Sequence, residues 1–311
     1  MVCHSARATG AGVSTPPPRV PVHDASLEAA LVLAACHALV ELPGDGSTDK
    51  STGKPKASSV IGDPIELAAL KGVEWRYDAS KQECVPGNFD AFAKGIASLK
   101  HELAALKTGD LQRTRCEARI QDLESREAAA QKRAAANPIA KCTLKQRHHF
   151  SSDLQRMSVT CNVFTKASSS TPQGYCLVKG SPEALDPLLA KGAMPSWYWP
   201  SYNSLAEEGM RVLALAYKKV DAKDQGGQGA ADDDDGVSGE KSRSWVESNL
   251  SFAGFIAFTC KTRSDSPTVV SALLESGHQV RWWCWCELWC SSCTLLLLLL
   301  LFVLALRRRA A

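Results

Sequence analysis

The first strong apolar pattern runs from position 27 to position 42. Its spacing of three and four residues predicts a buried helix, which Asp24 or Ser26 can cap and which Pro43-Gly44 ends. A second helical pattern, over 61–70, opens with a Gly62-Asp63-Pro64 turn. The residues at helical spacing in the first helix are Leu27, Leu31, Ala34, Ala35, Leu39 and Leu42.

A helical hairpin of coiled-coil type is predicted within 88–137, because apolar residues recur by three and four on both sides of Gly109-Asp110. Charged residues cover its other faces, so we expect an insertion that projects from the domain. The hairpin is either a partner-binding arm or a solvated decoration, and the second interpretation is favoured. The apolar positions are Phe89, Phe92, Ile96, Leu99, Leu103, Leu106, Cys116, Ile120 and Leu123.

Beyond Pro138 the pattern becomes that of strands. Met157, Val159, Cys161 and Val163 alternate with polar residues, as in a half-buried strand. Further strands are expected at 175–179, 211–220 and 252–258. Helices and strands together predict an α+β fold, in which helices pack against an antiparallel β-sheet.

Composition sets the outer segments apart from this domain. Residues 1–23 are rich in small residues and proline and are expected to be a disordered lead, and one domain is expected over 24–280. Within it, 221–244 is expected to be a disordered loop. Its run Asp232–Asp235 could bind magnesium, but a hydrated loop is the favoured interpretation.

The chain's charge gives no reason to expect nucleic acid as a partner. The net charge of its 311 residues is +3, and three arginines stand together at 307–309. The twelve cysteines show no repeated spacing, which is typical of a reducing, cytosol-facing environment.

The most informative segment surrounds Lys179. A strand brings this lysine to its end, and Gly180 permits a sharp turn. Ser181 can cap a helix that has Pro182 at its first position and Glu183 in its first turn. A lysine beside a helix N-terminus attracts anions.

Four motifs occur in an order that resembles the nucleotide-binding domain of P-type ATPases. The resemblance extends from about Leu27 to Gln279. The residues before Gly62 and after Phe252 are similar to the type V, endoplasmic-reticulum branch. The motifs are Gly62-Asp63-Pro64-Ile65-Glu66, Phe150-Ser151 with Arg156-Met157-Ser158-Val159, Lys179-Gly180-Ser181-Pro182-Glu183 and Glu208-Gly209-Met210-Arg211-Val212-Leu213-Ala214.

The resemblance implies an ATP site. Phe150 would stack on the adenine, Glu66 would lie near the amino edge of the base, Lys179 would line the pocket and Arg211 would reach toward the phosphates. Each residue also has a purely structural interpretation. Phe150 would then be a core aromatic and Glu66 a solvated helix residue. Lys179 would be a solvated lysine and Arg211 a surface cation.

The implied function is ATP hydrolysis coupled to transport of a cation or a transmembrane peptide. The implied place is the cytosolic face of the endoplasmic-reticulum membrane, and the implied partners are ATP, Mg²⁺ and the remaining domains of a parent ATPase. The phosphorylated Asp-Lys-Thr-Gly-Thr motif is absent, and Asp49-Lys50-Ser51-Thr52-Gly53 is interpreted as a loop. We therefore expect this chain to contain no catalytic residue and to bind ATP without hydrolysing it. Mg²⁺ would be bound with the missing phosphorylation domain.

The tail 281–311 departs from the family and is rich in Trp, Cys and Leu. It suggests an unspliced or frame-shifted end. Two other interpretations are a zinc site, formed by the tail cysteines, and a membrane segment over 282–306 that ends at Arg307. The alternative for the whole chain is a non-catalytic coiled-coil-hairpin interaction protein, tail-anchored through its leucine run. The tail cysteines are Cys284, Cys286, Cys290 and Cys293.

Overall fold

A computed structural model describes residues 2–5, 16–42, 59–106, 111–168, 171–220, 242–259 and 265–279. The chain divides into two compact units, 1–260 and 261–311. Of the second unit, the structure describes one helix, α8 (Ser266–Glu275), with its flanking residues. The acidic run, Asp49 and the tail lie outside the described residues.

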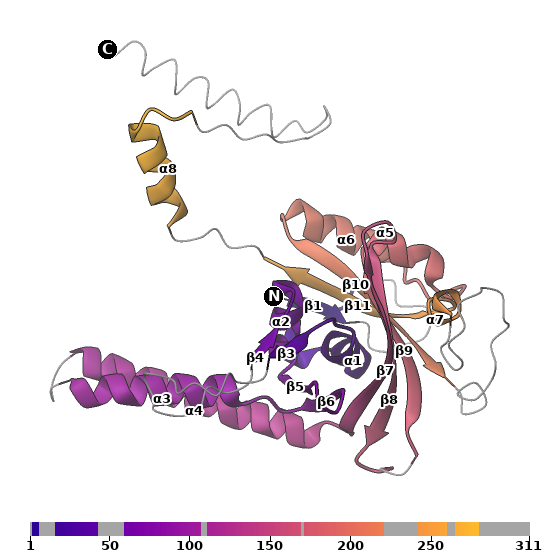
Figure 1. The fold of residues 1–311 in the computed structure, drawn as a ribbon, viewed down its shortest axis with the longest axis horizontal. Coiled ribbons are helices and arrows are strands. Elements are labelled where there is room, and N and C mark those ends of the chain that lie inside the picture. Colours follow the sequence, from indigo (N-terminus) through magenta and orange to yellow (C-terminus); the bar gives the residue numbers. More distant parts are fainter. Residues whose placement is uncertain are drawn as a thin grey trace. The chain divides into compact units, whose positions relative to one another are not determined.

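The first unit is built on one long antiparallel sheet (Figure 1). In the described residues it has nine strands in the order β2-β1-β11-β10-β9-β8-β7-β6-β5, and β3 pairs with β4 separately. The strands are β1 (Val2–Ser5), β2 (Val20–Pro21), β3 (Val40–Leu42), β4 (Ser59–Ile61), β5 (Trp75–Asp78), β6 (Glu83–Pro86), β7 (Ile139–Ser151), β8 (Arg156–Thr165), β9 (Gln173–Gly180), β10 (Arg211–Val220) and β11 (Ser251–Phe258).

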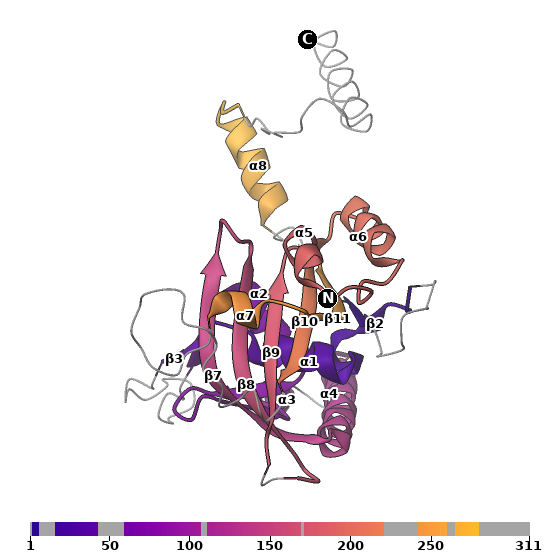
Figure 2. The same cartoon turned by 90° about the vertical axis from the view of Figure 1, so that its right-hand side faces the viewer.

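Helices pack against both faces of this sheet, and two more form a separate hairpin (Figures 1 and 2). The predicted α+β fold with an antiparallel sheet and flanking helices is confirmed. The helical elements of the first unit are η1 (Val22–Asp24), α1 (Leu27–Ala35), α2 (Pro64–Gly72), α3 (Asp90–Ala105), α4 (Leu111–Ala136), α5 (Pro182–Leu185), η2 (Asp186–Leu188), α6 (Tyr198–Glu207) and α7 (Arg243–Val246).

The sheet separates two apolar cores, because successive side chains of a strand point to opposite faces. Odd-numbered residues of β8 and β9, such as Met157 and Leu177, pack with α1 and α2. Even-numbered residues of β9 and β10, such as Val178 and Ala214, pack with α5 and α6. Each face of the sheet therefore has its own hydrophobic core.

The hairpin of α3 and α4 has a small apolar core of its own, in which Ile96, Leu99, Cys116 and Ile120 are buried. Its base is tied to the domain by the ion pair of Arg133 with Glu74 (2.5 Å). Hairpin and sheet thus have separate apolar cores, and this ion pair links them at the base.

Several local predictions were wrong at their edges. The first helix ends at Ala35, not Leu42, because Cys36 leaves helical geometry and donates a hydrogen bond to the Met157 carbonyl (Sγ···O 3.5 Å). Part of the predicted disordered lead forms β1 and β2, since β1 pairs with β11 and β2 with β1 through backbone groups, which need little from the sequence. The predicted loop 221–244 extends too far, because Ser242 caps α7.

Gly180 lies where the sheet leaves no room for a side chain. A Cβ at this position would lie 2.7 Å from the Gln155 carbonyl oxygen, 2.7 Å from Arg156 Cβ and 2.8 Å from Leu185 Cδ1. Two of these neighbours are a backbone atom and a Cβ, which cannot move aside without shifting a strand. Only glycine lets the turn between β7 and β8 approach the end of β9 this closely.

His37 follows α1 and is buried against Tyr77, with ring centroids 4.5 Å apart. Its Nδ1 accepts a hydrogen bond from the Leu39 backbone N–H (3.2 Å), which requires an unprotonated Nδ1. Burial, together with the positive charges of Lys179 and Arg147, lowers the pKa of His37 to about 3. The ring is therefore neutral in the folded chain.

We expect Gly180→Ala to lower the free energy of unfolding by about 1–3 kcal/mol, the usual cost of overpacking a tight site. Gly95→Ala is the control, because an added Cβ there would meet only the movable end of Leu123 and alanine favours the α3 helix. Denaturant unfolding of both variants measures the difference. Equal effects of the two substitutions would contradict the packing argument.

We expect the stability of the chain to fall as pH drops from 7.5 to 5. Below pH 6.5, His37 becomes protonated in the unfolded chain but stays neutral in the folded chain. The free energy of unfolding therefore falls with decreasing pH, with a limiting slope of about 1.4 kcal/mol per pH unit. His37→Gln should flatten this slope, and His101→Gln, on the exposed side of α3, should keep it. Melting temperatures across the pH series test this, and an unchanged slope in His37→Gln would refute it.

Candidate functional site

The predicted site residues gather at one end of the sheet because antiparallel strands alternate in direction. Ser151 at the end of β7 pairs with Arg156 at the start of β8, and Arg156 pairs with Gly180 at the end of β9. Gly180 in turn pairs with Ala214, three residues into β10. The strand ends that carry Phe150, Lys179 and Arg211 are therefore neighbours.

Lys179 and Glu66 meet directly. Lys179 Nζ lies 2.7 Å from Glu66 Oε1, and the two side chains are only 13% and 12% exposed. The other carboxylate oxygen of Glu66 accepts a hydrogen bond from the Ala38 backbone N–H (2.9 Å). Glu66 thus joins the segment after α1 to the end of β9, and its interpretation as a solvated helix residue is wrong.

The same contacts partly neutralise Lys179. Its ammonium lies on the face of α1 and α2, near the buried thiol of Cys36. Burial, opposed by the lysine charge, raises the pKa of Cys36 to about 12, so this thiol stays protonated. A protonated, fully buried thiol makes a poor nucleophile, and Cys36 acts here as a packing residue.

Phe150 and Arg211 are the open members of the group. The Phe150 ring is 61% exposed, so its interpretation as a core aromatic is wrong. Arg211 is exposed at the start of β10, and alternation along the strand puts it on the face of Leu215, which pairs with Lys179. This end of the sheet thus presents an aromatic surface and an exposed guanidinium.

The supporting motif residues shape the backbone. Asp63 caps α2 through the Ile65 N–H (2.7 Å), and Ser181 caps α5 through the Ala184 N–H (3.2 Å), with Pro182 at the first position of α5. Glu183 is engaged by Tyr202, whose pKa this hydrogen bond raises. Because α5 has only one turn, its dipole adds little to anion binding.

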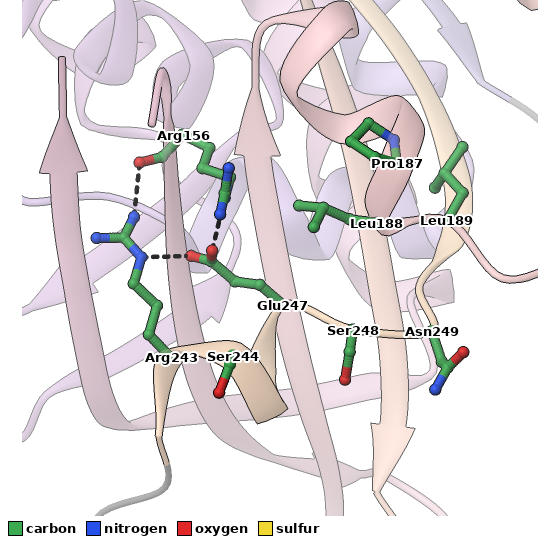
Figure 3. Close-up of a pocket in the computed structure, with 9 residues that line it drawn as sticks. All are labelled: Arg156, Pro187, Leu188, Leu189, Arg243, Ser244, Glu247, Ser248 and Asn249. Carbon is green, nitrogen blue, oxygen red and sulfur yellow. Dashed lines mark hydrogen bonds and ion pairs between the residues drawn. The ribbon is translucent and has the colours of Figure 1, made fainter. Parts of the chain in front are cut away.

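Arg156 belongs to a charged cluster on the opposite face, which the sequence interpretation missed (Figure 3). Glu247, 2% exposed, accepts hydrogen bonds from Arg156 Nε (2.6 Å), Ser158 Oγ (2.8 Å) and Arg243 Nε (2.8 Å). Burial alone would raise the pKa of Glu247, but these three hydrogen bonds lower it below its usual value. The i,i+4 spacing of Arg243 and Glu247 after the capping Ser242 was the available signal.

Beside this cluster lies an open pocket of about 430 Å³ (Figure 3). One wall is apolar and comes from η2 and the residue that follows it. The other wall is polar and comes from α7 and the residues that follow it. The lining residues are Arg156, Pro187, Leu188, Leu189, Arg243, Ser244, Glu247, Ser248 and Asn249.

The part of the chain that the structure describes holds no group of three or more His, Cys, Asp or Glu side chains placed to bind a metal ion. Among its helices, none combines the length and apolar character needed to cross a bilayer.

Comparison with known proteins gives the family of the chain, although no protein-family model matches it. A probable manganese-transporting ATPase of Arabidopsis thaliana is 30% identical over 249 residues, which are 80% of this chain and 14% of the relative. An endoplasmic reticulum transmembrane helix translocase of Aspergillus fumigatus is 28% identical over 257 residues, 82% of this chain and 15% of the relative. Its namesake in Saccharomyces cerevisiae is 26% identical over 249 residues.

The chain thus spans about one seventh of the length of these relatives. The similarity covers about four fifths of the chain, as the ordered motifs predicted. Over that part, the chain belongs to the type V P-type ATPases.

Proposed function

We propose that this chain is the ATP-binding domain of a type V P-type ATPase and that it binds ATP at the sheet end formed by β7 to β10. The exposed ring of Phe150 carries the proposal, because a solvent-facing aromatic ring next to cationic strand ends suits a purine nucleotide. Stacking a base on such a ring contributes about 1–3 kcal/mol.

The charged groups supply the rest of the site. Arg211 is exposed, and a guanidinium fork suits phosphate oxygens. Lys179 is held by Glu66, whose carboxylate can accept from the amino edge of adenine. These groups support a site that recognises the base through Phe150 and Glu66, and the phosphates mainly through Arg211.

Magnesium enters this proposal only with ATP and with the parent protein. The described residues hold no group of three or more His, Cys, Asp or Glu side chains placed to bind a metal ion. By the family resemblance, Mg²⁺ would be held by a phosphorylation domain. That domain would supply the chemistry of phosphoryl transfer. The residues here would bind and orient the nucleotide.

The role of the parent protein is proposed from its relatives. Relatives named as endoplasmic reticulum transmembrane helix translocases suggest that the parent protein lies in the endoplasmic-reticulum membrane, with this domain on its cytosolic face. Other relatives are named as manganese-, cation- or polyamine-transporting ATPases. We propose ATP hydrolysis coupled to transport of a cation or a transmembrane peptide by the parent.

The full chain is expected to bind ATP, and Phe150→Ala is expected to weaken binding about tenfold or more because it removes the stacking surface. Lys179→Gln should also weaken binding, since it removes a cation from the proposed site. Calorimetric titration, with melting curves to confirm folding, measures both effects.

Two hairpin variants are the matched controls. Phe92→Ala removes an aromatic ring from α3, and Lys100→Gln removes a lysine that pairs with Glu124 (3.0 Å). Neither should change ATP affinity. No heat from the folded wild-type chain would overturn the ATP proposal and favour the interaction-protein alternative.

The full chain is also expected to bind ATP without hydrolysing it, because the sequence lacks the Asp-Lys-Thr-Gly-Thr motif. A phosphate-release assay at saturating ATP and Mg²⁺ should match the buffer blank, and Asp49→Asn should leave ATP affinity unchanged. ATP-dependent phosphate release that disappears in Asp49→Asn would show that the loop interpretation of this segment is wrong.

A further inference from the structure

We propose that Arg243 is a positioning residue of the nucleotide site: from the opposite face of the sheet, it fixes the end of β7 that carries Phe150. The inference rests on the proposed ATP function and deepens it. It adds a residue that touches no nucleotide and acts through the backbone beside the stacking ring.

The strand pairing alone does not fix the backbone at Phe150. The register of β7 against β8 shifts at three places, and the last shift falls between His148, which pairs with Ser158, and Ser151, which pairs with Arg156. His149 and Phe150 fall within this irregularity. Antiparallel ladders hold side chains in place through regular backbone pairing, so this segment needs another support.

Arg243 provides that support with one side chain. Its Nη1 donates to the His149 carbonyl (3.3 Å), directly before Phe150, and its Nη2 donates to the Arg156 carbonyl (2.9 Å), directly after the turn. A planar guanidinium can hold two acceptors at a fixed separation. Arg243 thus ties together the two strands on either side of the turn.

Glu247 fixes the orientation of Arg243. Its buried carboxylate binds Arg243 Nε at 2.8 Å and Arg156 Nε at 2.6 Å (Figure 3). Charge-assisted hydrogen bonds of this kind are stronger and more directional than neutral ones. With Nε fixed by Glu247, the other two guanidinium nitrogens point at the carbonyls of β7 and β8.

The far side of the turn is held independently. The Ser181 N–H donates to the Gln155 carbonyl (3.0 Å), and Gln155 has a left-handed backbone (φ 48°). Besides its internal hydrogen bonds, such as that from the Gln155 N–H to the Ser151 carbonyl (2.8 Å), the turn is thus held from outside by the β9 end on one side and by Arg243 on the other. Loss of Arg243 would leave the Gln155 side in place and free the Phe150 side.

A double-mutant cycle on the full chain tests the inference. Arg243→Met keeps the aliphatic stem and removes every donor, and Phe150→Leu removes the ring but keeps an apolar contact, so that ATP binding stays measurable. We expect Arg243→Met to weaken ATP binding by about fivefold in the wild-type background and less than about twofold in the Phe150→Leu background, because coupled residues are not additive.

Hydrogen exchange provides a readout that needs no nucleotide. Arg243→Met should speed exchange in peptides that contain Phe150 and leave α4 unchanged. Arg243→Lys, which keeps the charge but not the fork, should give an intermediate effect. The matched control is Arg113→Met in the hairpin. Like Arg243, Arg113 donates to a backbone carbonyl, that of Leu106 (3.3 Å), and pairs with a glutamate four residues on, Glu117 (3.1 Å). Its loss should change neither ATP binding nor hydrogen exchange at Phe150.

The outcomes separate the two proposals. If the wild-type chain binds ATP and Phe150→Leu weakens binding, but Arg243→Met has no effect, the positioning role is wrong and the ATP site stands. An equal loss in both backgrounds would also overturn it, because Arg243 would then act independently of the ring. If the wild-type chain binds no ATP, both proposals fall.

Discussion

The pairing of β8 with β7 on one side and β9 on the other is the constraint on which the rest of this structure depends. Its register pairs Met157 with Lys179 and Arg156 with Gly180. Because neighbours along a strand face opposite sides, this one alignment sends Lys179 toward Glu66 and Arg156 toward Glu247. A slip of one residue would exchange the two faces and destroy both ion pairs.

Much of the fold was predictable because its strands and helices follow simple periods. Alternation over Met157 to Val163 gave β8, and the three-four spacing after Phe89 gave the hairpin. The end of α1 was not predictable, because Leu39 continues the helical spacing but is buried from a loop. Tertiary contacts of Cys36 with the Met157 carbonyl and of His37 with Tyr77, absent from any local pattern, decide where that helix ends.

The candidate site was predictable in part for a different reason. Ordered motifs identified Phe150, Lys179, Arg211 and Glu66, and the structure pairs two of them and puts the strand ends of the others nearby. The spacing of residues along the sequence could not reveal that Arg156 and Lys179 lie on opposite faces of the sheet. Nor could it reveal that Glu247 is buried and forms ion pairs with two arginines. The first fact depends on the register of β8 with β9, and the second on contacts between segments some 90 residues apart.

The Lys179–Glu66 pair need not break when a nucleotide binds. Glu66 is held by the Ala38 N–H as well as by the lysine, so the carboxylate is the fixed partner. An ammonium has three donors, and one bond to Glu66 leaves two for a ligand. Removing either member would instead leave a largely buried charge alone, which costs more than the pair contributes. In the proposed site, Glu66 would therefore hold Lys179 in position and leave two donors of its ammonium for the ligand, besides offering the carboxylate to the base.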